Sequence, residues 1–212
     1  MLADQEDVFY YVTLMNENYA MPSIPEGARE GILRGMHRVR ESRGVSPAKV
    51  RLLGAGTILN ESVAAAELLD KDWGIAADVY SVTSFTELRR EGMEVSRAAR
   101  HSSDGARHPV GERGPISWIE KQLPKNGTPI VAASDYVSAV PDLIRPWIGD
   151  AYTALGTDGF GRSDTRANLR KFFEVDRHAI AVAALHSLGD KRLAEAMGRY
   201  GIDPQAAPPW TR

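Results

Sequence analysis

The sequence predicts an α/β fold in which a mainly parallel sheet lies between layers of helices. Stretches typical of strands and of helices alternate from about residue 49 onward, which is the pattern of β-α-β crossovers. The strand-like stretches are short apolar runs, as expected for strands that are covered on both faces. Hydrophobic residues make up 43% of the 212 residues, so the chain can bury a substantial core.

Composition excludes several classes of protein. The chain has no cysteine, which excludes disulfides, thiolate metal sites and cysteine nucleophiles. A formal net charge of -2 and a pI of 6.2 give no field that would attract nucleic acid or an anionic membrane. The apolar runs are shorter than the about 20 residues that a membrane span needs, and the acidic start does not resemble a signal peptide. We therefore expect a cytoplasmic protein.

Residues 1–35 are expected to form a separate first part. Val8–Leu14 is β-branched and aromatic, which predicts a strand buried on both faces. No hairpin partner for this strand lies nearby in the sequence. A proline-containing loop follows over Asn16–Gly27, and Pro25 precedes a short helix expected over Glu26–Arg34.

Residues 36–202 are expected to form the α/β domain. The expected strands are Met36–Arg40, Lys49–Gly56, Ala77–Val82, Pro129–Ala133 and Ala151–Gly156. The expected helices are Thr57–Asp72, Phe85–Arg100, Ile116–Leu123, Thr165–Phe173, Arg177–Leu188 and Lys191–Tyr200, with a partly helical stretch over Tyr136–Ile148. Ser84 and Glu87 predict a reciprocal capping box. A loop is expected over 101–114, and the proline-rich segment 203–212 is expected to be a loose tail.

The glycine pair Gly54 and Gly56 lies where a strand is expected to turn into a helix. A phosphate could meet helix N–H groups there, but Leu59 stands at the third glycine position of the dinucleotide fingerprint and the phosphate-loop lysine is absent. A tight strand-to-helix turn is the favoured interpretation. The five histidines show no metal-ligand spacing, and no serine has the surroundings of a nucleophile elbow.

Two further stretches contain candidate site residues. Glu17 follows the first expected strand at its carboxyl end, the edge where ligands bind in α/β sheets. It could be an active-site carboxylate or a loop residue, and position alone favours the loop. The second stretch, Leu155–Asp164, is a glycine-rich turn. Asp164 is expected to cap the next helix, Phe160 to fill an apolar hole or an interface, and Arg162 to pair with a carboxylate or a partner chain.

Three blocks resemble the homodimeric pyruvate dehydrogenase E1 family of the transketolase-like superfamily. Val8–Tyr19 resembles the end of its pyrimidine-binding domain, and Asp78–Leu88 and Leu155–Asp164 resemble its C-terminal domain. The resemblance covers residues 5 to about 202. It implies a transketolase C-terminal-like domain preceded by a strand and loop of the pyrimidine-binding domain.

The resemblance also implies the activity of the parent enzyme. That enzyme decarboxylates pyruvate on thiamine diphosphate with Mg2+ and reductively acetylates the lipoyl group of the E2 acyltransferase, with each active site at a homodimer interface. This chain has no counterpart of the family's Gly-Asp-Gly metal motif, and Ala20 stands where some members carry histidine. The isolated chain is therefore expected to bind neither cofactor nor metal, and Glu17 is at most the edge of an active site.

Three functional hypotheses follow from the sequence. The leading one is a C-terminal portion of pyruvate dehydrogenase E1 that contributes dimer contacts and could contact E2, without catalysis of its own. The second is a subunit of a split thiamine-diphosphate enzyme. The third is a stand-alone small-molecule-binding regulatory module that uses the strand ends near Gly54, Ser134 and Gly156.

Overall fold

The computed structural model describes residues 3–5, 7, 9, 17–20, 22–42, 49–101 and 115–212. Within this part the predicted α/β fold is confirmed. The strands are β1 (Met36–Arg40), β2 (Val50–Ala55), β3 (Ala77–Val82), β4 (Ile130–Ala133) and β5 (Tyr152–Leu155). The helices are α1 (Arg29–Leu33), α2 (Ile58–Trp73), α3 (Phe85–Arg100), α4 (Trp118–Gln122), α5 (Ala139–Asp142), α6 (Arg166–Phe172), α7 (Arg177–Ser187) and α8 (Leu193–Tyr200).

The five strands form one sheet in the order β1-β3-β2-β4-β5. Strands β2, β3, β4 and β5 pair in parallel, whereas β1 runs antiparallel to β3 at one edge. Every residue of β2 and β4 is buried, as expected for central strands covered on both faces. The sheet therefore brings the carboxyl ends of β2, β4 and β5 to the same end of the molecule.

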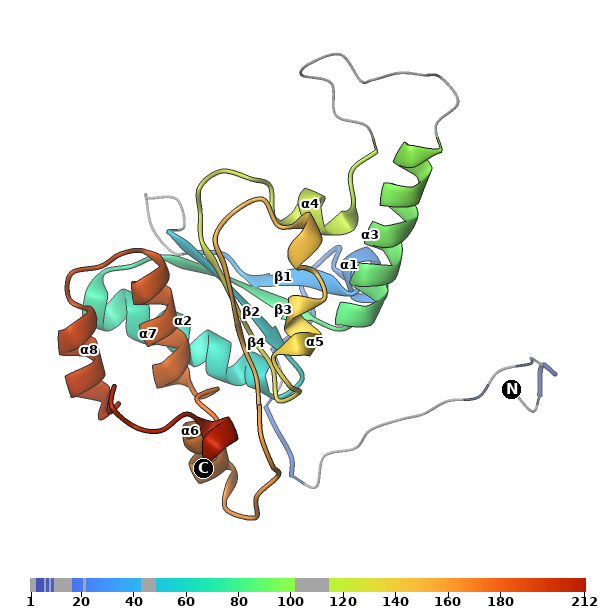
Figure 1. Cartoon of the computed structure of the whole chain (residues 1–212). Coiled ribbons are helices and arrows are strands. Elements are labelled where there is room, and N and C mark those ends of the chain that lie inside the picture. The colour runs from blue at the N-terminus through green and yellow to red at the C-terminus, as the bar shows by residue number, and fades with distance from the viewer. Residues whose placement is uncertain are drawn as a thin grey trace.

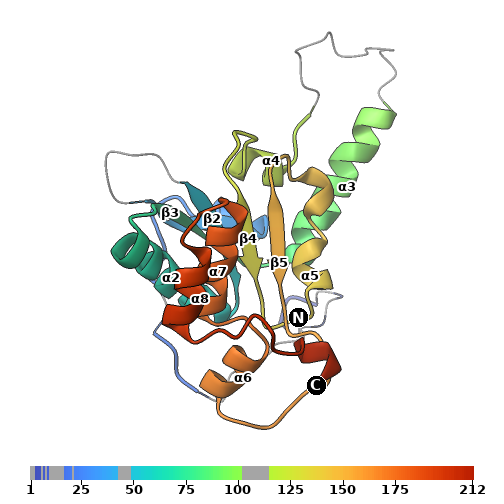
Figure 2. The ribbon, with the colours of Figure 1, turned by 60° about the vertical axis from the view of Figure 1, so that its left-hand side comes forward.

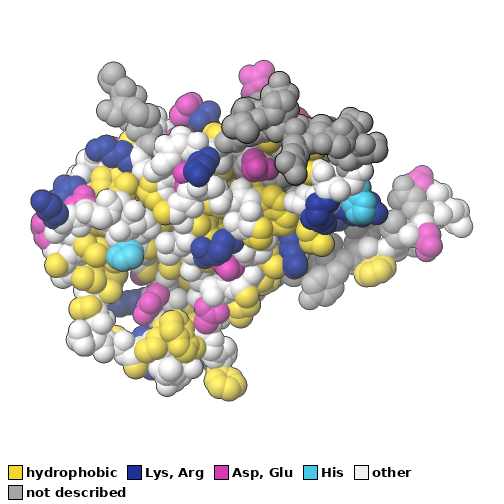
Figure 3. Space-filling view, turned by 45° about the horizontal axis from the view of Figure 1, so that its top comes forward, with side chains coloured by type: hydrophobic (Ala, Val, Ile, Leu, Met, Phe, Trp, Pro, Cys, Tyr) yellow, Lys and Arg dark blue, Asp and Glu magenta, His cyan; other side chains and the backbone are white. Residues whose placement is uncertain are grey.

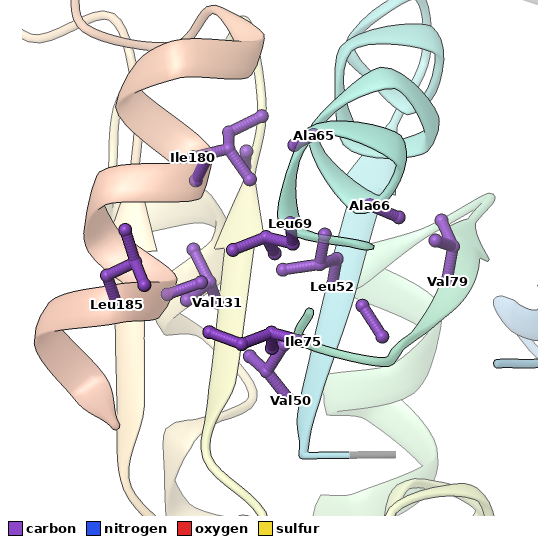
Figure 4. Packing of buried hydrophobic residues seen from close by; sticks show 14 of the residues in the cluster. Val50, Leu52, Ala65, Ala66, Leu69, Ile75, Val79, Val131, Ile180 and Leu185 are labelled. Atoms are coloured by element: carbon purple, nitrogen blue, oxygen red, sulfur yellow. The ribbon is translucent and has the colours of Figure 1, made fainter. Parts of the chain in front are cut away.

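The helices cover the sheet in two layers (Figures 1 and 2). On one face α2 and α7 pack against the sheet and α8 packs on α7, and on the other face lie α3, α4 and α5. In the first layer Leu52 and Val131 meet Leu69 of α2 and Ile180 of α7 (Figure 4). These four side chains are at most 1% exposed, so the packing between the layers fixes where the strand ends lie.

Helix boundaries follow the predicted capping residues with two differences. Helix α3 spans the expected residues, and the Ser84 hydroxyl accepts from the N–H of Glu87 at 3.1 Å. The predicted return bond from Glu87 is wrong, because its carboxylate pairs with Arg90 instead. A complete capping box occurs at α4, between Ser117 and Glu120, and the sequence analysis did not predict it.

The predictions for the two ends of the chain have different outcomes: the structure does not test the first and contradicts the second. The strand expected over Val8–Leu14 lies outside the described residues, apart from Phe9. The segment expected to be a loose tail contains a 3-10 turn over Pro209–Thr211, and Pro209 is buried. The Arg212 guanidinium lies 5.0 Å from the centre of the Phe172 ring. The last residues therefore pack on the domain, because burial of Pro209 and the contact of Arg212 with Phe172 hold them there.

None of the helices in the described part combines the length and the apolar character that crossing a membrane requires.

Candidate functional site

The candidate site lies at the carboxyl end of the sheet. Figures 1 and 2 place α6 and the C-terminus at this end, beneath the strands. Three turns meet there: the turn after β2 at Gly56, the turn after β4 at Asp135 and the turn after β5 at Thr157. The Thr157 N–H donates to the Tyr136 carbonyl at 2.8 Å, and its hydroxyl donates to the Asp135 carbonyl at 2.7 Å. These bonds tie the last two turns together.

The glycine pair after β2 forms the tight turn that the sequence favoured. A Cβ atom on Gly54 would lie 2.6 Å from the Cα of Leu59, so only glycine allows α2 to approach the strand this closely. Gly56 has a φ of 55°, in the left-handed region that glycine adopts without strain. The turn delivers Thr57 directly to the start of α2.

A pocket of about 260 Å³ opens between these turns and α6. Its wall includes the β2–α2 turn, the loop after β5 and one side of α6. The lining residues are Thr57, Ile58, Asp135, Thr157, Gly159, Gly161, Arg162, Arg166, Leu169, Arg170, Phe173 and Val175. The lining contains three arginines and one aspartate, and two of the arginines, Arg166 and Arg170, are paired with carboxylates outside the lining.

Glu17 and Tyr19 lie against α6 beside this pocket. The Glu17 carboxylate pairs with the Arg166 guanidinium at 2.9 Å and accepts from the Tyr19 hydroxyl at 3.1 Å. The hydrogen bond from Arg166 lowers the pKa of Glu17, and the Tyr19 bond acts in the same direction. Arg170 donates to the Tyr19 hydroxyl at 3.4 Å. The chain before α1 is thus attached to α6 at the pocket rim, with Glu17 as an ion-paired residue.

A buried carboxylate that the sequence analysis missed anchors α6 from the other side. Glu61 of α2 is 5% exposed and accepts from Arg170 at 3.0 Å and from Arg177 Nε at 2.9 Å. Burial acts to raise its pKa, but the hydrogen bonds and charge of Arg177, with the charge of Arg170, outweigh burial and lower it. Its position between Ile58 and Ala65, on the apolar stripe of a helix, is the signal that could have identified it.

The three candidates in the loop after β5 have different outcomes. The predicted cap at Asp164 is wrong by one residue: the Thr165 hydroxyl accepts from the Asn168 N–H, and Asp164 accepts from the Thr165 N–H and the Asn168 amide. Arg162 stacks at 4.2 Å on the Phe172 ring and forms no ion pair with another described residue. Phe160 is 87% exposed, so it fills no hole within the described part of the chain.

Phe160 belongs to a group of exposed apolar side chains around this loop. We call Tyr136, Val137, Phe160 and Trp210 the apolar patch. They are between 46% and 87% exposed, and the backbone of Trp210 packs against Gly159. Figure 3 shows hydrophobic side chains at the lower end of the molecule, where this loop and the C-terminus lie in Figure 1. Exposed apolar groups gathered in this way mark contact surfaces.

The described residues contain no group of three histidine, aspartate or glutamate side chains that could hold a metal ion. Asp158, the carboxylate in the glycine-rich turn, uses Oδ1 to accept from the Ser138 N–H at 3.1 Å.

Comparisons with known proteins identify the family of this domain. The family model for the transketolase-like C-terminal domain matches residues 35–176. The pyruvate dehydrogenase E1 component of Pseudomonas aeruginosa is 47% identical over 99% of this chain and 24% of its own length. The E1 component of Escherichia coli K12 is 44% identical over 97% of this chain and 23% of its own length. The chain thus spans about a quarter of the length of these relatives.

Solved structures support the fold. Transketolase from Leishmania mexicana is 18% identical, with a TM-score of 0.51 over 76% of this chain and 19% of that chain. Sequence and structure comparisons therefore agree on the architecture of the domain.

Proposed function

Because this chain belongs to the transketolase-like C-terminal domain family and matches the C-terminal part of pyruvate dehydrogenase E1 components, we propose that it serves as the assembly domain of such an enzyme. The enzyme would carry out thiamine-diphosphate-dependent oxidative decarboxylation of pyruvate and pass the acetyl group to the lipoyl group of E2. In this proposal the chain works in the cytoplasm and forms contacts between two copies of the enzyme. Cofactor and metal are held by parts outside the matched domain.

The observation that carries this proposal is the apolar patch. Phe160 is 87% exposed and Trp210 is 60% exposed, although burying a large aromatic side chain is favourable by about 1.5–3 kcal/mol. Both lie on the loop and tail that flank Gly159. An aromatic side chain held out on a glycine-rich turn is suited to insertion into a second protein surface. The occupant that we propose is the second copy in a homodimer.

A chimera tests the assembly role. The C-terminal quarter of the P. aeruginosa E1 component is replaced by this chain, and dimer formation and pyruvate-dependent acetylation of a lipoyl domain are measured. We expect a dimeric and active chimera. Phe160→Ser with Trp210→Ser should give monomers and reduce the activity at least tenfold, because the patch would no longer bury aromatic area.

Met93→Ser is the matched control, since Met93 is 53% exposed on α3, away from the patch. It should leave dimer and activity unchanged. A Phe160/Trp210 variant that stays dimeric and fully active would refute the assembly role. Titration calorimetry of the 212-residue chain with thiamine diphosphate and Mg2+ tests the other half of the proposal, and tight stoichiometric binding would contradict it.

A further inference from the structure

The pocket at the carboxyl end of the sheet has features that assembly does not explain. We propose that it binds a small metabolite through a compact oxyanion, a phosphate or a carboxylate group. The proposal is independent of the dimer role, because it rests on the interior of the pocket and not on the apolar patch.

Charge is the first argument. The lining contains Arg162, Arg166 and Arg170 but a single carboxylate, Asp135. Arg166 is engaged by Glu17 and Arg170 by Glu61. Arg162 has no carboxylate partner among the described residues, and its only ring contact is with Phe172. A planar guanidinium held on an aromatic face keeps its donors available for an oxyanion, which it can bind in bidentate geometry.

Thr57 is the second and independent argument. It is 7% exposed, lines the pocket, and its hydroxyl makes no hydrogen bond with another described residue. It also does not cap α2. The rest of the residue is enclosed and Thr57 lines the pocket, so water or a ligand in the pocket is the partner that its hydroxyl can take. A ligand oxygen in the pocket would supply that partner.

The backbone adds a donor of the same kind. At the start of the 16-residue helix α2, the N–H groups of Leu59 and Asn60 donate to the carbonyls of Gly56 and Thr57 at 3.3 and 3.2 Å, whereas the Ile58 N–H makes no bond with another described residue. It lies at the end of the helix where the dipole favours negative charge. The Ile58 N–H, the Thr57 hydroxyl and Arg162 are the donors in the pocket lining, and Asp135 is the carboxylate there.

The size of the pocket limits the ligand. Its volume of about 260 Å³ lies below the range of about 300–1,000 Å³ that is usual for drug-sized ligands. The ligand is therefore a small acid or phosphate ester, and a dinucleotide is too large. The ion pairs from Glu17 and Glu61 hold α6 on both sides, so the wall that carries the arginines is fixed before the ligand binds.

Titration of the 212-residue chain tests the site, with inorganic phosphate and succinate as separate probes at constant ionic strength. Calorimetry and backbone amide NMR shifts are the measurements. We expect saturable binding of at least one probe, with shifts centred on Thr57 and Thr157, and the stronger probe identifies phosphate or carboxylate as the group that is recognised.

Variants decide whether the binding is local. Thr57→Val removes the hydroxyl and keeps the shape, and Arg162→Gln removes an exposed charge that forms no ion pair with another described residue. Each should weaken binding at least tenfold, whereas Arg89→Gln, an exposed arginine on α3, should leave it unchanged. Absence of saturable binding of both probes overturns the proposal. Equal affinity in wild type, Thr57→Val and Arg162→Gln overturns it as well.

Discussion

The two ends of the parallel sheet differ in whether their buried polar groups have hydrogen-bond partners. At the amino end, Arg51 is 5% exposed, donates to the Pro124 carbonyl at 3.1 Å and lies 3.7 Å from the Asp150 carboxylate. Asp150 also accepts from the N–H groups of Asn126 and Gly127. At the carboxyl end, the hydroxyl of Thr57 and the buried Oγ of Ser62 have no hydrogen-bond partner among the described residues.

This difference separates a stabilising end from a binding end. Buried polar groups that satisfy one another fix the fold but leave nothing for a ligand. Polar groups that are left without partners cost stability, and a fold retains them where a ligand or another chain completes them. Glu61 lies between these cases, because it is fully paired yet supports the arginine-bearing helix of the pocket.

Among these predictions, Glu61→Gln should cause the largest loss in the free energy of unfolding. The substitution removes the charge that Arg170 and Arg177 share, and breaking a buried ion pair costs about 3–5 kcal/mol. We expect the free energy of unfolding, measured by urea denaturation, to fall toward the lower part of that range because Arg177 is partly exposed. Glu67→Gln is the control, since Glu67 is 65% exposed in its pair with Arg40, and it should change stability by less than about 1 kcal/mol.

Arg51→Met should have the next largest effect. It removes the bond to the Pro124 carbonyl and the positive neighbour of Asp150, and an unsatisfied buried group costs about 1–3 kcal/mol. Oxyanion binding at the other end of the sheet should be unaffected. The comparison would fail if urea denaturation showed no loss of stability, or if the variant altered the affinity for phosphate or succinate.

The contribution of Glu61 should depend on pH. Its pKa in the folded protein is lowered below the ordinary value of 4.5. A carboxyl of this kind contributes stability above its unfolded pKa and loses it as the pH falls through the folded pKa. The difference in unfolding free energy between wild type and Glu61→Gln should therefore be full near neutral pH and shrink below about pH 4.5. A difference that stayed constant down to about pH 3 would contradict the pKa shift.

Phe160→Ser should have the smallest effect on stability. The side chain is 87% exposed, and substitutions at such positions usually change stability by less than about 0.5 kcal/mol. Thermal unfolding of the 212-residue chain should be nearly unchanged, although the same substitution weakens assembly in the chimera. A loss of several degrees in Tm would show that Phe160 packs within the chain and would remove the apolar patch from the binding end.

Much of the fold could be predicted from local patterns. Helix α3 matches its prediction from Phe85 to Arg100 because Ser84 provides a cap at a fixed spacing. Strand β2 was predicted over Lys49–Gly56, and it spans Val50–Ala55 with every residue buried. The antiparallel direction of β1 was not predicted, because a five-residue strand shows no sign of its neighbour.

The candidate site was predicted less well than the fold. The tight glycine turn after β2 was predicted where it occurs. Glu17 lies beside the pocket, but the strand that was expected to carry it is outside the described residues. Glu61 was missed, since its partner Arg177 is 116 residues away. Asp164 was assigned the role of Thr165 because both are good N-cap residues, and only the backbone geometry distinguishes them.

The sequence by itself determined the fold class, most element boundaries and the family, because these depend on periodicity, turn residues and contiguous motifs. The tertiary structure alone decided which charges pair, that Phe160 is exposed and that Thr57 keeps a hydroxyl without a partner. These properties arise where β2, β5 and α6 converge from distant parts of the chain. A local sequence pattern does not show whether a side chain at the carboxyl end of the sheet has a hydrogen-bond partner, because the partner comes from a distant part of the chain.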